Sequence, residues 1–493
     1  MKLSDSLLFR QQAYIGGQWC DADSRQIIEV LNPFDGSLIG TVPKMGQAET
    51  ARAIASADQA LPGWKAKTGK ERGAILRKWH DLIEANREDL ALMLTLEQGK
   101  PLAEARGELT YAQSFVEWFS EEAKRVYGDV LPNTRSDQRL LAIKQPVGVC
   151  AAIIAWNFPS ALVTRKVSPA LAAGCTVVLK PAELTPFTAL ALVHLAEQAG
   201  LPPGVFNVVT GDPVQIGKEL TANPVVRKLT FTGSTETGRL LMQQSASNIK
   251  KLSLELGGNA PFLVFEDADL AEAIDGLLAS KFRNAGQTCV CANRVYVHAA
   301  VVKEFSEKLA ARIKQMKVGN GLNEGVVLGP LIDNRAVTKV SRLVDDAVGK
   351  GAQVLAGGKL LKEGTLLFEP TLLLGISSEM HISREEIFGP VIGITTFSTE
   401  QEVLALANDS PSGLAAYFFT ANLERVWRVM EGLEYGIVGV NTGAVSNEVG
   451  PFGGIKESGI GREGSKYGIE EFLEIKYVCL SGKSLNPLPA LPH

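Results

Sequence analysis

From residue 147 onward, the sequence alternates short, almost uninterrupted apolar runs with stretches of helical periodicity. Five such runs lie within residues 147–258: VGVCAAIIAW, TVVLK, FNVVTG, KLTFTG and LSLELGG. A strand that helices cover on both faces is apolar throughout, whereas a strand with one wet face alternates. The pattern therefore predicts an α/β fold with a doubly wound parallel sheet. Right-handed crossovers would bring the carboxyl ends of these strands to one edge, where such sheets bind ligands.

The rest of the chain predicts further units. A second α/β series begins near residue 260 and is long enough for another domain. Residues 48–127 carry apolar residues at helical spacing, with stops at Gly99 and Gly128. The extended LEIKYVCL near the C-terminus needs a partner strand, either the 140–146 segment or another subunit.

Composition narrows the functional classes. A net charge of −4 gives no electrostatic reason to expect nucleic acid or an anionic membrane as a partner. No apolar run reaches the roughly 18 residues of a membrane span, and the N-terminus resembles neither a signal nor a transit peptide. Six scattered cysteines favour a reducing, cytoplasmic location. Five widely spaced histidines show no metal-site spacing, so we expect no metal.

One close cysteine pair, Cys289 and Cys291, lies in FRNAGQTCVCANR. A cysteine at a loop-to-helix junction can be a thiolate nucleophile. A zinc site would need more Cys or His residues nearby, and a Cys-x-Cys disulfide would close a small, strained ring. A buried, unreactive pair is the remaining interpretation.

Three other segments suggest chemistry, although each also fits an ordinary turn or surface loop. Glu255 in LELGG ends a predicted strand and is a candidate general base. Lys180 and Glu183 in LKPAE could donate to and accept from ribose hydroxyls. GSTETG, beginning at Gly233, opens a predicted helix whose amides favour a phosphate.

Read together, the motifs WNFP, KPAE, FTGS, LELGG, GQTC, EEIFGP and PFGG occur in this order. Over nearly its whole length the chain resembles the aldehyde dehydrogenase superfamily. TRK at 164–166, KFRNAGQTCVCANR and GREGSKYGIEEFLEIKYVC resemble its succinate-semialdehyde dehydrogenase branch, to which glutarate-semialdehyde dehydrogenases are near relatives. The resemblance implies two doubly wound parallel-sheet domains and a small β oligomerisation arm. These parts are an NAD(P)-binding domain (1–128 and 147–256), a catalytic domain (257–453) and the arm (129–146 and 470–486).

The resemblance also implies catalytic roles. Cys289 matches the nucleophile that forms a thiohemiacetal and then a thioester, and Glu255 matches the base that activates water to hydrolyse it. The side chain of Asn157, with the backbone amide of Cys289, matches the oxyanion hole. Lys166 and Glu463 match a proton-handling network. Relatives that pass the acyl group to coenzyme A generally lack the glutamate, so Glu255 favours hydrolysis.

For the cofactor, NAD or NADP, the resemblance implies a larger set of residues that contact the adenosine ribose, the pyrophosphate and the nicotinamide ribose. They are Ile154, Trp156, Lys180, Glu183, Gly211, Gly217, Phe231, Gly233, Ser234, Leu256, Glu386 and Phe388. A carboxylate at Glu183 can accept from a ribose 2′-hydroxyl but would repel a 2′-phosphate, so NAD is favoured and dual use stays open.

For the substrate, Arg165 and Arg283 match two arginines that hold a distal carboxylate, and Ser446 matches a supporting hydroxyl. Succinate semialdehyde fits, and so does a five-carbon analogue, because one methylene changes binding by only about 1–3 kcal/mol.

Cys291 matches a redox-switch cysteine of some relatives, or is a small buried side chain. Alternatives are a broad-specificity aldehyde dehydrogenase and a catalytically silent scaffold. The family implies a homodimer or homotetramer.

Overall fold

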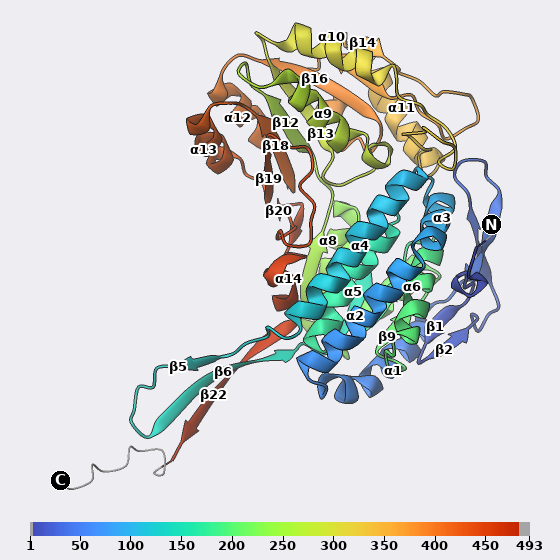
Figure 1. Ribbon diagram of the computed structural model, residues 1–493, viewed down its shortest axis with the longest axis vertical. Helices are drawn as coiled ribbons and strands as arrows, with labels where there is room; N and C mark the ends of the chain where they lie inside the picture. Colours follow the sequence, from blue (N-terminus) through green and yellow to red (C-terminus); the bar gives the residue numbers. More distant parts are fainter. Residues whose placement is uncertain (1–2, 483–493) are drawn as a thin grey trace.

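The computed structural model describes residues 3–482 and contains two α/β units and a projecting arm (Figure 1). The first unit holds an eight-stranded sheet in the order β2-β1-β9-β8-β7-β10-β11-β21. Its five central strands are parallel, which confirms the predicted doubly wound sheet. The antiparallel edge strands were not predicted. The strands are β1 (Ala13–Ile15), β2 (Gln18–Cys20), β7 (Val149–Ile153), β8 (Thr176–Lys180), β9 (Phe206–Val208), β10 (Val226–Thr232), β11 (Lys251–Glu255) and β21 (Gly459–Ile460).

Helices cover both faces of this sheet, as the apolar runs require. The helical stretch before residue 100 is broken at Asn86, which ends α2 and begins α3, while Gly99 ends α3 in a left-handed conformation with φ 93°. α4 ends at Glu122, before the expected stop at Gly128. The helices are α1 (Gln47–Lys65), α2 (Gly69–Ala85), α3 (Arg87–Gln98), α4 (Leu102–Glu122), α5 (Pro159–Ala173), α6 (Phe187–Gln198), α7 (Pro213–Ala222) and α8 (Thr235–Ser245).

The second unit holds a seven-stranded sheet in the order β14-β15-β16-β13-β12-β18-β19, parallel except for β14. The strands are β12 (Ala260–Val264), β13 (Ala292–His298), β14 (Gln353–Ala356), β15 (Thr371–Leu374), β16 (Val391–Phe397), β18 (Ala415–Phe419) and β19 (Ile437–Val440). The helices are α9 (Leu270–Lys281), α10 (Val302–Ile313), α11 (Asn334–Gly349), α12 (Glu400–Asn408) and α13 (Leu423–Gly432), while α14 (Ser465–Glu470) packs against α4 and α5 of the first unit.

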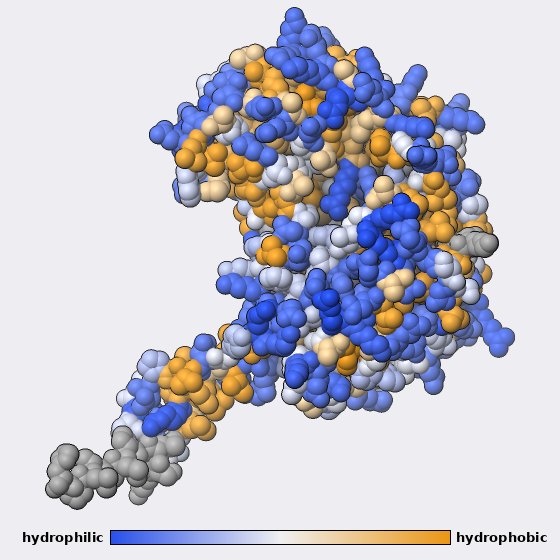
Figure 2. Space-filling view, viewed as in Figure 1, coloured by the Kyte–Doolittle hydropathy of each residue, from blue (hydrophilic) through white to orange (hydrophobic). Residues whose placement is uncertain are grey.

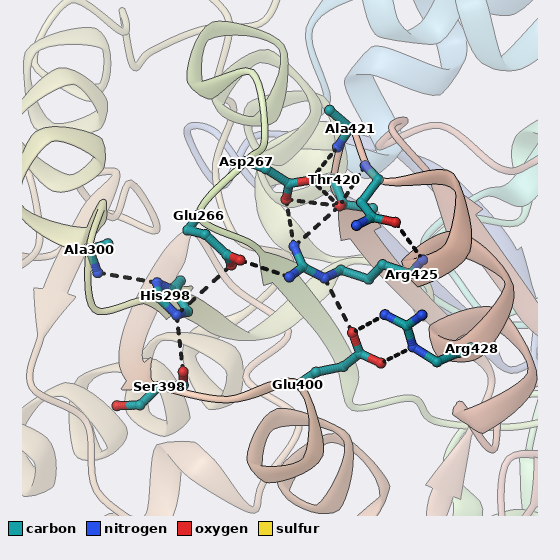
Figure 3. A network of polar contacts seen from close by, with 11 residues as sticks. Glu266, Asp267, His298, Ala300, Ser398, Glu400, Thr420, Ala421, Arg425 and Arg428 are labelled. Atoms are coloured by element: carbon teal, nitrogen blue, oxygen red, sulfur yellow. Dashed lines mark hydrogen bonds and ion pairs between the residues drawn. The ribbon is translucent and has the colours of Figure 1, made fainter.

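An ionic network occupies the carboxyl edge of the second sheet (Figure 3). Arg425 on α13 donates to Asp267 at 2.6 Å, Glu266 at 2.7 Å and Glu400 at 3.2 Å. Two of these acids follow β12 and the third begins α12, and Thr420 after β18 donates to Asp267. The network ties the ends of β12 and β18 to the covering helices α12 and α13.

The arm is a three-stranded antiparallel sheet that projects from the body (Figure 1). β22 (Leu473–Ser481) pairs along its length with β6 (Gln138–Pro146), the first of the two alternatives for the terminal strand, and β5 (Asp129–Leu131) lies on the other side of β6. Apolar side chains are exposed on it, among them Val130 and Ile475 (Figure 2). Positions 483–486 of the predicted arm lie outside the described residues.

Two small ribbons complete the described strands: β3 (Ile27–Leu31) with β4 (Leu38–Pro43), and β17 (Ser412–Gly413) with β20 (Ile455–Lys456). Within residues 3–482, no helix has the length and apolar character needed to cross a membrane.

Candidate functional site

A cavity of about 340 Å³ lies where the carboxyl edge of the first sheet meets loops of the second unit. Strand register places Ile153, Lys180 and Glu255 at the same edge of the first sheet. The loops that precede β13 and β16 supply the opposite wall. Twelve of the residues singled out from the sequence line the cavity: Trp156, Asn157, Arg165, Gly233, Ser234, Glu255, Leu256, Arg283, Cys289, Glu386, Phe388 and Ser446.

Cys289 lies on a tight turn between a short 3-10 segment, η3 (Arg283–Gly286), and β13. Asn284 and Ala285 have φ of 52° and 54°, in the left-handed region, which curls the chain before the cysteine. The expected loop-to-helix junction is therefore wrong, because the loop leads into a strand. No helix N-terminus lies there to stabilise a thiolate.

The environment of Cys289 favours the thiol over the thiolate. Burial raises its pKa to about 12, opposed by the positive charge of Arg165 and reinforced by Glu255 and Glu386. The side chain is half-buried and borders the cavity, so a small carbonyl compound can reach it.

Glu255, the last residue of β11, is buried, and neither carboxylate oxygen has a hydrogen-bond partner among the described residues. Burial first, and the nearby Glu463 second, raise its pKa well above the usual range, while Arg165 and Lys166 oppose them. A buried carboxylate without donors favours its neutral form and binds a proton readily. These are the properties of a general base that faces a cavity.

Asn157 lies between β7 and α5, and its side-chain amide donates one hydrogen to the carbonyl oxygen of Gln287 at 3.1 Å. The amide has a second hydrogen, which faces no acceptor in the described part of the chain. Because Asn157 and Cys289 line the same cavity, this free donor suits an oxygen that becomes negative during attack on a carbonyl.

A buried ion cluster lies behind the cavity wall. Glu463 contacts Lys166, and its other carboxylate oxygen is 2.5 Å from Nε of Arg165 without hydrogen-bond alignment. Lys166 also donates to Thr230 at 3.1 Å. Burial raises the pKa of Glu463, but Lys166 and Arg165 outweigh it and hold the pKa below its usual range.

The two arginines predicted to bind a substrate carboxylate differ in their partners. Arg165 is engaged by Glu463, donates to the Tyr111 hydroxyl at 3.4 Å and lies 4.2 Å from the Phe452 ring. Arg283 has no ion pair or hydrogen bond within residues 3–482 and lies 4.7 Å from the ring of Phe158. Its planar guanidinium is therefore free for a carboxylate ligand.

Ser446 borders the same cavity as the two arginines. No hydrogen bond joins its hydroxyl to either of them in the described part of the chain. Its supporting role stays a prediction.

Predicted cofactor residues form the other part of the wall. Glu386 accepts from the Gly258 amide at 2.9 Å, and burial raises its pKa to about 7. The rings of Phe388 and Trp156 meet edge to face at 5.7 Å. Ser234 caps α8 by accepting from the Thr237 amide, so a helix start faces the cavity, where backbone amides favour a phosphate.

The remaining predicted residues do not line the cavity. Lys180 and Glu183 form an ion pair with one another. Gly211 has φ 140°, and a Cβ there would lie 2.2 Å from the Met45 carbonyl oxygen. Cys291 is buried and is contacted by Lys281 Nζ at 3.5 Å. Ile154 and Phe231 are buried at strand ends, and Gly217 lies within α7.

Both Cys289 and Cys291 are free cysteines in the structure, so their reversible disulfide stays a prediction. No group of three or more His, Cys, Asp or Glu side chains within residues 3–482 could hold a metal ion.

Sequence reasoning missed the aromatic side chains around the arginines. Tyr111 of α4, Phe158 and Phe452 line the cavity and contact one or both guanidinium groups. Phe158 and Phe452 lie within WNFP and PFGG, so attention to those motifs could have found them. Helical periodicity gives no comparable signal for Tyr111.

Comparison with known proteins agrees with this geometry. The model of the Aldehyde dehydrogenase family matches residues 19–478. The chain is 61% identical to the glutarate-semialdehyde dehydrogenase of Pseudomonas putida, over 98% of this chain and 100% of that enzyme. It is 60% identical to the NADP(+) succinate-semialdehyde dehydrogenase of Escherichia coli, over 97% of this chain and 100% of that enzyme. The crystal structure of succinate-semialdehyde dehydrogenase from Burkholderia pseudomallei superposes with a TM-score of 0.97, at 58% identity. The match covers 98% of this chain and 100% of that one.

The pKa of Cys289 predicts a pH-dependent reactivity. Only the thiolate is alkylated rapidly, and below the pKa its fraction rises roughly tenfold per pH unit. We expect the rate of Cys289 modification by iodoacetamide to rise steadily from pH 7 to pH 9, as followed by peptide mass spectrometry. The exposed Cys479 is the internal control for the reagent. A rate for Cys289 that is flat over this range would show that the thiolate is already formed at pH 7.

Proposed function

Because the chain belongs to the aldehyde dehydrogenase family, we propose that it oxidises a short dicarboxylic semialdehyde, succinate or glutarate semialdehyde, to the dicarboxylate with NAD(P)+. The observation that carries the substrate class is Arg283, a guanidinium with no ion pair or hydrogen bond within residues 3–482, on the wall of the cavity that holds Cys289. The named activities of the two relatives, at 61% and 60% identity, support the same class.

In the proposed reaction, the sulfur of Cys289 bonds to the aldehyde carbon as its proton passes to bulk water, and the side-chain amide of Asn157 donates to the resulting oxyanion. NAD(P)+ supplies the hydride acceptor, and the product of this half-reaction is a thioester on Cys289. Glu255 then removes a proton from the water that cleaves the thioester. The sum is aldehyde, water and oxidised cofactor giving acid, reduced cofactor and a proton.

The buried cluster of Lys166, Arg165 and Glu463 would determine which carboxyl group near the cavity is ionised. Glu463, in contact with Lys166 and Arg165, stays ionised, whereas Glu255 has no ion pair in the described part of the chain and binds protons more readily. We assign Lys166 and Glu463 to holding this charge balance, and their predicted part in proton handling is to leave Glu255 as the group that accepts the proton. The Lys166 ammonium is the donor that Glu463 already contacts.

Cofactor choice follows from Lys180 and Glu183. Their ion pair engages the lysine and presents a carboxylate at the proposed adenosine-ribose site. A carboxylate accepts from a 2′-hydroxyl and repels a 2′-phosphate, so NAD is the preferred form of the cofactor. The proposed nicotinamide side of the site is the wall formed by Glu386, Phe388 and Trp156.

The larger assignments follow the same proposal. Residues 1–128 with 147–256 bind the cofactor, and residues 257–453 carry the nucleophile. The arm, whose edge strands β5 and β22 leave apolar side chains exposed, mediates assembly into a homodimer or homotetramer. A cytoplasmic location fits the free cysteines of residues 3–482.

Removing the unpaired guanidinium tests the substrate class. Arg283→Met should raise KM for succinate semialdehyde at least tenfold, because a charge-assisted contact to carboxylate is lost. It should change KM for butanal, an uncharged aldehyde of equal length, by less than about twofold. Steady-state NADH formation with both aldehydes measures this difference.

The control for this test is Arg312→Met, which removes an exposed arginine paired with Asp275. This substitution should leave KM for succinate semialdehyde and KM for butanal unchanged. An equal loss for the two aldehydes in Arg283→Met would contradict the proposed carboxylate contact and favour a broad-specificity enzyme.

Glu183→Ala should shift cofactor preference toward NADP. The substitution removes a repelling carboxylate and frees Lys180 for the 2′-phosphate, so the ratio of kcat/KM for NADP to that for NAD should rise about tenfold or more. Glu197→Ala, a change of an acid on α6 paired with His194, is the control. An unchanged ratio in Glu183→Ala would rule out this carboxylate as the discriminating group.

A further inference from the structure

Lys100, at the turn between α3 and α4, is a buried cation outside the wall of the reaction cavity. It borders a second cavity of about 430 Å³, separated from the first by Phe158 and Arg283, which line both. Its ammonium group donates to Glu108 at 2.5 Å and to the backbone carbonyl of Asn157 at 2.8 Å. The nitrogen lies 4.0 Å from the centre of the Phe158 ring. A buried cation with this set of contacts fixes the groups around it.

The Asn157 carbonyl is held from two sides. Lys100 is one donor, and the side-chain amide of Asn284 is the other, at 3.0 Å. The Asn284 amide also reaches the Gln287 carbonyl at 3.3 Å, which is the acceptor of the Asn157 side-chain amide. These contacts form a closed frame that joins the peptide after Asn157 to the turn that carries Cys289.

Glu108 holds the neighbouring helix start. The N-cap of α5 is Phe158, whose side chain cannot accept a hydrogen bond from the first turn. Glu108 from α4 takes that role and accepts from the amides of Ser160 at 2.9 Å and Ala161 at 3.2 Å. The Lys100–Glu108 pair therefore anchors the backbone on both sides of Phe158.

We propose that Lys100 is a positioning residue: with Glu108 it holds the Asn157 peptide so that the second side-chain amide hydrogen of Asn157 meets the oxygen of an aldehyde bound to Cys289. The inference rests on the proposed oxyanion role of Asn157. Lys100 does not touch the reacting atoms, and its effect passes through the position of that amide. A shift of about 1 Å at such a donor can cost a hundredfold in rate.

The test is the burst of NADH formation in a stopped-flow experiment with saturating cofactor and succinate semialdehyde. Lys100→Met should slow the burst at least tenfold and leave KM for the cofactor within twofold. Because this change leaves Glu108 buried without its cation, Lys100→Met/Glu108→Gln is the second variant. It removes both charges and keeps a side-chain oxygen for the α5 amides. The same loss is expected in it.

Lys228→Met is the matched control. Lys228 is equally buried, contacts Glu471 at 3.4 Å and Ser253 at 2.5 Å, and lines neither cavity. The rate of its NADH burst should stay within twofold of the rate of the unchanged enzyme. A loss in this variant equal to that of the Lys100 variants would show a general effect of a missing buried cation and overturn the proposal.

The same substitutions in an Asn157→Ala background separate positioning from general damage. If Lys100 acts through Asn157, the Lys100 changes should cost less than twofold once the amide is absent. The same fold-loss in both backgrounds, or no loss in either, would overturn the role of Lys100 alone. A burst that Asn157→Ala leaves unchanged would instead refute the oxyanion role in the proposed function, and the inference with it.

Discussion

The site depends on how two buried carboxylates are neutralised. Glu463 and Glu255 both lie away from water, yet burial decides the pKa of only one of them. Lys166 and Arg165 contact Glu463 and keep it ionised, whereas Glu255 has no hydrogen-bond donor within residues 3–482 and its pKa rises. Two acids in one environment thereby acquire different tasks, a fixed negative charge and a proton acceptor. The carboxyl edge of the first sheet, the turn that carries Cys289 and the two arginines all meet at the cavity beside Glu255.

The two sheets contribute to the cavity in different ways. The first sheet supplies its carboxyl edge, where Glu255 ends β11 and Asn157 follows β7 after a short connection. The second sheet supplies loops from its amino edge, while its carboxyl edge carries the Arg425 network (Figure 3). The reaction cavity between the units follows from this arrangement, and the frame around Lys100 joins the same two units beside the second cavity.

Much of this could be predicted from the sequence because the signals are local. Continuous apolar runs identified the parallel strands, and TVVLK coincides with β8. Motif order alone placed Glu255, Asn157 and Cys289 in one family pattern, and the structure brings them to one cavity. The short antiparallel edges β1, β2 and β21 were missed because strands of two or three residues carry no periodicity.

Long-range pairing was the other limit. Lys166 and Glu463 are 297 residues apart, and only the family resemblance placed them in one network. No signal in either segment indicates that Arg165 shares the same carboxylate. The turn around Cys289 was wrongly assigned to the start of a helix. The chain turns there through left-handed residues of η3, and no local pattern in RNAG indicates that conformation. The contacts of Lys100 with Asn157 are likewise tertiary and have no sequence signal.

The most direct measurement is mass spectrometry of Glu255→Gln enzyme quenched with acid during turnover of succinate semialdehyde and NAD+. The account predicts one NADH per subunit in the burst, and a succinyl group on the peptide that contains Cys289, because the thioester forms but is not hydrolysed. An acyl group on a different residue, or free succinate accumulating at the normal rate with no adduct, would contradict it.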